Sequence, residues 1–140
     1  LFTGFGTLHP DSDDIKGDVD YLLDLGLEGV KLHPDFQLFA LNEERAFKLG
    51  EAIYDADIPL MIHCGDFRYN YSNPEQLMPF LDKFSDMTVI GAHFAGWSMW
   101  EEATEKLAGR ENLYVDLSSS LETDGFKDEN KIKEIMEVIN

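Results

Sequence analysis

The segment Pro59-Leu60-Met61-Ile62-His63 is a short apolar run that ends in a histidine, and Thr88-Val89-Ile90-Gly91-Ala92-His93 repeats the pattern further along the chain. Runs this short and this continuously apolar are typical of strands in a parallel sheet, where both faces of the strand are buried. Similar runs lie at 1–7, 29–32 and 113–117. The sequence therefore predicts five strands.

Amphipathic segments separate these runs and predict a helix after every strand. The helices are expected at 14–25, from Asn42 to about 56, after Asn73, from Ser98 to about 108, and over 132–139. Asn42 is a good N-cap, and Asn73 with Gln76 and Ser98 with Glu101 have the spacing of capping boxes. Pro79 is expected to kink the third helix or to begin another one. Strands alternating with helices indicate an α/β fold with a parallel sheet.

Two architectures fit this alternation. The 140 residues form five units of 28 residues, so eight such units would need about 224 residues, which suits a closed (β/α)₈ barrel. On this interpretation the chain holds five of the eight units of a TIM-type barrel. A complete five-stranded doubly wound sheet is the alternative, and periodicity alone does not separate the two. We treat 1–140 as one domain, and because the chain begins without Met we expect it to be an internal piece of a longer polypeptide.

The composition limits the classes of partner. With 28 Asp and Glu against 11 Lys and Arg, the formal net charge of −17 excludes a protein that holds nucleic acid or an anionic membrane by basic contacts. No apolar run approaches the roughly 18 residues that span a bilayer. The single cysteine, Cys64, cannot form an internal disulfide and is expected to be a buried thiol. These features predict a cytoplasmic protein whose partner is a small molecule.

All four histidines lie at or just after the predicted carboxyl end of a strand. Because these ends share one edge of a parallel sheet, His33, His63 and His93 can converge on one site. His63 and His93 are the best candidate metal ligands, since each ends an apolar strand and a glycine-containing turn follows it. His9 and His33 precede prolines, and for them a loop-shaping role and a substrate contact remain equally open.

Other polar residues follow the same strands. Arg68 lies in an aromatic-rich segment and could bind a substrate carboxylate, while Trp97 could wall the same pocket. Lys31 has the strand parity of His33, so it points either into the site, where it needs a carboxylate or a bound anion, or outward. Asp116 ends the fifth strand and either meets the substrate or caps a turn.

Four segments, taken in order, resemble the amidohydrolase superfamily, and more narrowly its amidohydrolase-related branch of metal-dependent hydrolases and decarboxylases. They are 29–34, 59–65, 89–96 and 112–118. The resemblance implies strands three to seven of a metal-bearing barrel, with His63 as the fifth-strand metal ligand. It implies that His93 is the sixth-strand histidine, which binds the metal or contacts substrate or water. The expected activity is a metal-dependent hydrolysis of a small carboxylate- or amide-bearing substrate, with zinc favoured over manganese or iron.

The sequence also departs from that family's pattern. It contains no His-x-His pair, and no eighth-strand aspartate motif follows the fifth unit. Asp116 belongs to the seventh strand by position, so it is a catalytic candidate with His93 and not the missing ligand. We therefore expect a hydrolase parent protein and an incomplete metal site in this chain. The alternatives are a decarboxylase of aromatic or muconate-type acids, a non-catalytic α/β binding module, and a homo-oligomer formed by pairing of open sheet edges.

Overall fold

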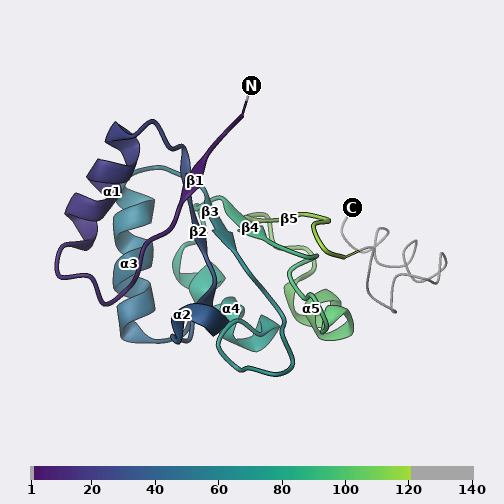
Figure 1. The fold of residues 1–140 in the computed structure, drawn as a ribbon. Coiled ribbons are helices and arrows are strands. Elements are labelled where there is room, and N and C mark those ends of the chain that lie inside the picture. Colours follow the sequence, from purple (N-terminus) through teal and green to yellow (C-terminus); the bar gives the residue numbers. More distant parts are fainter. Residues whose placement is uncertain (1, 121–140) are drawn as a thin grey trace.

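The computed structural model describes residues 2–120, which fold around one parallel sheet (Figure 1). Its strands, β1 (Phe5–Gly6), β2 (Gly29–Leu32), β3 (Leu60–Ile62), β4 (Val89–Gly91) and β5 (Leu113–Val115), lie in the order β1-β2-β3-β4-β5. A doubly wound sheet reverses its strand order, whereas a barrel adds each strand beside the previous one. The barrel-type prediction is thus confirmed and the doubly wound alternative is wrong. The first strand is shorter than the run predicted at 1–7.

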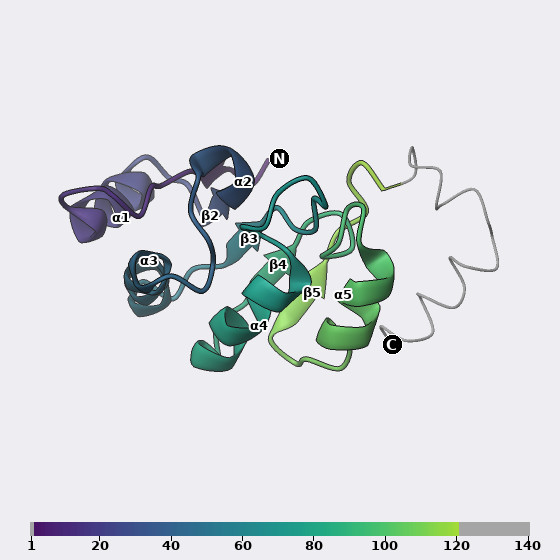
Figure 2. The ribbon, with the colours of Figure 1, turned by 90° about the horizontal axis from the view of Figure 1, so that it is seen from below.

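The helices are α1 (Ile15–Asp24), α2 (Pro34–Gln37), α3 (Glu44–Asp55), α4 (Pro74–Lys83) and α5 (Trp100–Leu107). Figure 2 shows α1, α3 and α4 along one side of the sheet, with α5 beside β5. The predicted helices correspond to all of these except α2, which the sequence did not indicate, and the helix expected over 132–139 lies outside the described residues. None of the helices within residues 2–120 has the length and apolarity that crossing a membrane requires.

The predicted helix boundaries need correction in detail. α4 continues through Pro79, which neither ends it nor begins another helix. Asn73 does precede Pro74 as the N-cap of α4, but its side chain makes no capping hydrogen bond. Glu43 rather than Asn42 is the N-cap of α3, and Met99 rather than Ser98 is the N-cap of α5. The two capping boxes are therefore absent. The Ser98 hydroxyl donates to the Gly65 carbonyl instead, and Asn73 Oδ1 has no hydrogen-bond partner among the described residues.

The strands divide their side chains between two faces of the sheet. One set is fully buried with the helices in the main core: Val30, Leu32, Leu60, Ile62 and Val89. The alternate residues Lys31, Met61 and Ile90 stand in register on the other face and are only half-buried. Because side chains alternate along a strand, this parity sends His33 and His63 to the open face.

Cys64 lies on the opposite, helix-covered face. It is fully buried within the main core, and its Sγ–H donates to the carbonyl of Ile62. Burial raises the pKa of the Cys64 thiol to about 12. The expectation of an inert, buried thiol is confirmed, and Cys64 is no nucleophile at neutral pH.

Candidate metal and substrate site

A cavity of about 300 Å³ opens where the carboxyl ends of β2, β3, β4 and β5 meet. The predicted site residues all line it: His33, His63, Arg68, His93, Trp97 and Asp116. Residues from four β/α units thus come together although they are far apart in sequence. His9 stays apart from them, with its Nε2 against the carbonyl of Gln37.

His63 and His93 form the centre of this cavity. His63 Nδ1 and His93 Nε2 lie 3.0 Å apart, and their rings meet at 67°. Two nitrogen ligands of one tetrahedral ion, at bond lengths of about 2.1 Å, lie about 3.4 Å apart, so a small shift of the rings would admit an ion. Burial, followed by the neighbouring His33 and His93, lowers the pKa of His63 to about 3. His63 is therefore neutral at physiological pH, which is the form that binds metals.

An unusual left-handed turn presents His93 to the cavity. His93, Phe94 and Ala95 have φ values of 59°, 58° and 54°, a region that residues other than glycine rarely adopt. Asp116 stabilises the turn, because its Oδ1 accepts the N–H of His93 at 3.0 Å and its carbonyl accepts the N–H of Phe94 at 2.9 Å. Of the two roles left open for Asp116, the structure thus shows a turn-capping contact.

Asp116 also fixes the segment that faces the other side of the His93 ring. Its Oδ1 accepts the N–H of Ser118 at 2.9 Å and the Ser118 hydroxyl at 2.7 Å. Burial raises the pKa of Asp116, but the hydrogen bonds from His93 and Ser118 outweigh burial and leave it lowered. His93 Nδ1 lies 2.5 Å from the Ser118 carbonyl. A carbonyl accepts only, so this contact places the imidazole proton on Nδ1 and leaves the Nε2 lone pair facing His63.

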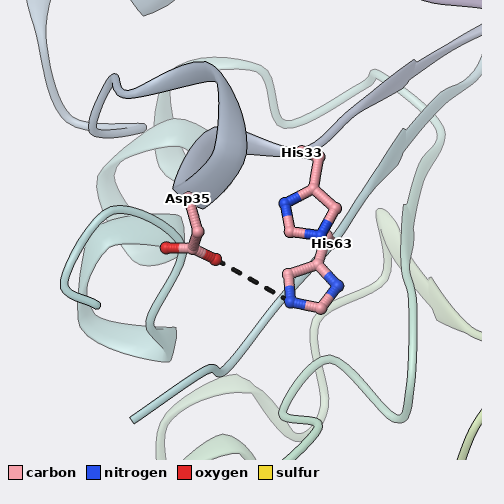
Figure 3. A group of neighbouring side chains, drawn as sticks. All are labelled: His33, Asp35 and His63. Atoms are coloured by element: carbon pink, nitrogen blue, oxygen red, sulfur yellow. Dashed lines mark ion pairs between the residues drawn. The ribbon is translucent and has the colours of Figure 1, made fainter. Parts of the chain in front are cut away.

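Asp35 is a site residue that the sequence analysis missed. It lies in the first turn of α2, is 1% exposed, and accepts the Ser72 hydroxyl on Oδ2 at 2.5 Å. The same Oδ2 lies 3.8 Å from His63 Nε2 (Figure 3). His93 lies on the other side of the ring, at Nδ1. Burial raises the pKa of Asp35 above its usual range. Asp35 lies on the Nε2 side of His63, at a distance too long for a hydrogen bond.

A second group of donors also includes His63. Within the described residues, His33 Nδ1, Asp35 Oδ1 and His63 Nε2 are buried without a hydrogen-bond partner, and one donor atom of each residue lies within 4.8 Å of the others. Nitrogen and carboxylate donors suit a divalent transition metal. The His33 ring, however, stacks on His63 at 3.9 Å and 11°. Because nitrogen lone pairs lie in the ring plane, these parallel rings converge on one ion only if a ring turns.

Arg68 and Trp97 stand together at the same cavity. Arg68 Nε and Nη2 donate to both carboxylate oxygens of Asp66, at 2.7 to 3.2 Å, and these bonds lower the pKa of Asp66. The Arg68 guanidinium lies 5.3 Å from the Trp97 ring centroid. Asp66 is buried while the Arg68 side chain is 54% exposed. Much of the Arg68 hydrogen-bonding capacity is therefore already engaged by Asp66.

The two loops that follow β3 and β4 lock together beside the histidines. Ser98 donates to the Gly65 carbonyl at 2.8 Å and accepts the N–H of Phe67 at 3.1 Å. Gly65 has φ of +81°, and a Cβ at this position would lie 2.3 Å from the Cα of Gly96. Only glycine fits such an approach of two backbones. This contact explains why the loops after His63 and His93 both carry glycine.

Comparison with known proteins places this geometry in a family. The family model described as Amidohydrolase matches residues 1–140. A comparison with curated proteins found no match. The fold is similar to an uncharacterized TIM-barrel protein from Bordetella bronchiseptica, with 26% identity and a TM-score of 0.71 over 86% of this chain and 44% of that one.

Two further solved structures share the fold. One, from Lactobacillus casei, is assigned as a metal-dependent hydrolase and has 18% identity and a TM-score of 0.67 over 89% of this chain and 42% of that one. The other, from Acinetobacter baumannii, is assigned as a 2-pyrone-4,6-dicarboxylic acid hydrolase with citric acid bound, at 14% identity and a TM-score of 0.58 over 97% of this chain and 50% of that one. The chain thus spans half or less of the length of these structures. It belongs to the amidohydrolase family, and its five parallel strands form part of a TIM-type barrel.

Proposed function

We propose that this chain supplies half of the active site of a cytoplasmic, zinc-dependent hydrolase that acts on a small carboxylate- or amide-bearing substrate. The observation that carries the proposal is the pair of imidazole nitrogens 3.0 Å apart, His63 Nδ1 and His93 Nε2. The Ser118 carbonyl beside His93 Nδ1 leaves the Nε2 lone pair of His93 facing His63 Nδ1. These two nitrogens either share a proton or hold a divalent cation in its place, and the cation is the alternative proposed here. The remaining metal ligands would come from residues other than the histidines of this chain.

His63 and His93 would hold the ion, and the other residues hold these ligands in place. When bound, a divalent metal polarises a carbonyl and lowers the pKa of a bound water to about 7. The Ser118 carbonyl orients His93 through Nδ1, and Asp35 would orient His63 if its carboxylate accepts the Nε2 proton of a metal-bound imidazole. Asp116 fixes the backbone of His93 and stays ionised beside the cavity, where it is available to accept a proton.

The substrate would occupy the space beside this pair. His33, stacked on His63, forms one wall of the cavity, and Trp97 with Arg68 forms another. A planar substrate can pack on these rings, and the exposed part of the Arg68 guanidinium can orient a carboxylate. A decarboxylase would use the same cavity, so the products formed by the whole protein decide between the two reactions.

The proposal is tested by zinc titration of the metal-free chain and its variants, with bound metal measured by elemental analysis. We expect His63→Ala and His93→Ala each to weaken zinc binding at least tenfold, while His9→Ala, a histidine outside the cavity, leaves it unchanged. Equal affinities of the His63→Ala and His9→Ala variants would refute the site. Asp35→Asn should weaken binding about 10- to 100-fold through the lost orientation of His63.

The same titration separates the two possible donor sets. If His63 and His93 bind the ion, His33→Ala keeps most of the affinity because His33 only stacks on His63. If His33, Asp35 and His63 bind it, His33→Ala loses affinity and His93→Ala does not. In the whole protein, zinc-dependent release of acid from an ester or lactone supports hydrolysis, whereas release of CO₂ from an aromatic acid establishes the decarboxylase alternative.

A further inference from the structure

Lys31 is the one lysine on the strands of the described sheet, and it points into the cavity. It lies in β2 between Val30 and Leu32, which face the helices, so its own side chain projects from the open face. Its Nζ lines the cavity region, is shielded from solvent, and has no hydrogen-bond partner within residues 2–120. Of the two orientations that the sequence left open, the inward one is confirmed.

A buried ammonium group needs an acceptor, and the described residues do not provide one. Arg68, the other cation of the cavity, is paired with Asp66. Asp116 acts on Lys31 only through space, while its Oδ1 accepts from His93 and Ser118. The carboxylates of the cavity are thus committed to other donors, and Lys31 Nζ, which is shielded from solvent, has no acceptor among the described residues. Burial accordingly lowers the pKa of Lys31, and a bound anion would favour its charged form. Leaving a buried charge unpaired is costly, so an anion from solution would bind there favourably.

We propose that Lys31 anchors a carboxylate group of the ligand, so that the cavity takes small organic acids with the acid group innermost. Any reaction of the bound acid rests on the proposed function, whereas the binding of the acid by Lys31 does not. His33 follows Lys31 by two residues on the same face of the strand. An acid held at Lys31 therefore lies in the same cavity as His63 and His93.

The cavity wall beside Lys31 suits the carbon skeleton of such an acid. Met61 stands in register with Lys31 on the neighbouring strand, and Ala92 and Trp97 line the same cavity. These apolar contacts beside Lys31 favour a carboxylate that carries an aromatic or branched apolar body. The neutral amide of the same shape lacks the charge and should bind poorly.

The test is calorimetric titration of the metal-free chain with benzoate and with its neutral isostere benzamide. We expect benzoate to bind more tightly, and Lys31→Met to weaken benzoate binding about tenfold or more without changing benzamide binding. The control is Lys48→Met, which removes an exposed lysine of α3 and should leave benzoate binding unchanged. Circular dichroism establishes that both variants fold.

A measurement on the unaltered chain guards against a misfolded variant. In ¹⁵N-labelled protein, saturating benzoate should shift the amide signals of Lys31 and Met61, and benzamide should not. Equal binding of benzoate and benzamide, or equal loss in the two lysine variants, would overturn the proposal. Benzoate binding that depends on Lys31 in a chain that never binds zinc would keep the acid site and refute the proposed zinc binding by His63 and His93 in this chain. Zinc binding without any preference for benzoate over benzamide would keep the metal site and refute the acid site at Lys31.

Discussion

His63 is the residue whose ionisation should most affect stability. Its pKa is about 3 in the folded chain and about 6.5 in an unfolded one, because burial opposes its charge. Between these values the unfolded state binds one more proton, so the free energy of unfolding falls as pH falls through this window. For the metal-free chain we expect a loss on the order of 1 kcal/mol per pH unit from about pH 6 to pH 4, measured by urea denaturation.

The matched control is His63→Gln, which cannot take up the proton. The slope of unfolding free energy against pH should be smaller in this variant than in the parent chain over the same window. His9→Gln, at a half-exposed position outside the cavity, should keep the parental slope. Identical slopes in the parent and the His63→Gln chain would mean that the imidazole is not buried in a neutral form.

At the scale of elements, the loops after β3 and β4 are held by a backbone contact that glycine makes possible. Gly65→Ala introduces a Cβ 2.3 Å from Gly96 Cα at φ of +81°, so the loops must separate. Gly109→Ala has a similar φ of +78° but open space around it, which makes it a control for backbone strain alone. We expect a loss in unfolding free energy of about 1 kcal/mol for Gly109→Ala and at least about 3 kcal/mol for Gly65→Ala.

Zinc affinity provides a second readout of this contact. Because the loops carry the residues that follow His63 and His93, Gly65→Ala should also weaken zinc binding, and Gly109→Ala should not. Equal losses of stability in the two variants would show that the loops tolerate separation and that the glycine contact does not hold the site together.

Elements whose signal is local were predictable, and those set by distant partners were not. Periodicity located β2 to β5 and the four long helices, because an apolar stripe is a property of the segment itself. Ser98 has the spacing of a helix cap, yet it bonds Gly65, which lies on another loop, and no local pattern reveals that choice. Nothing in the sequence near Asp35 indicates that it is buried. Its hydrogen-bond partner, Ser72, lies 37 positions away. The histidines were predictable because strand ends share one edge, a rule of topology.

At the scale of the whole molecule, two features oppose each other. Within the described residues, β1 and β5 each have a neighbouring strand on one side only, and Tyr114 on β5 is 60% exposed. Open parallel edges favour pairing with another chain. The net charge of −17 opposes association of like chains. The balance between these features should therefore depend on the concentration of salt.

We expect the isolated chain to be a monomer in about 0.01 M salt, where the screening length of about 30 Å lets the negative charges of two copies repel. In about 0.15 M salt this length falls to about 8 Å, and the edges should pair, so that light scattering reports a mass that rises with protein concentration. Tyr114→Lys, which puts a charge on β5, should return the chain to a monomer, because charged edge residues oppose pairing. Lys would also lower the net negative charge, so repulsion alone predicts the opposite change. A mass that stays monomeric at every salt and protein concentration would show instead that these edges do not recruit a second copy.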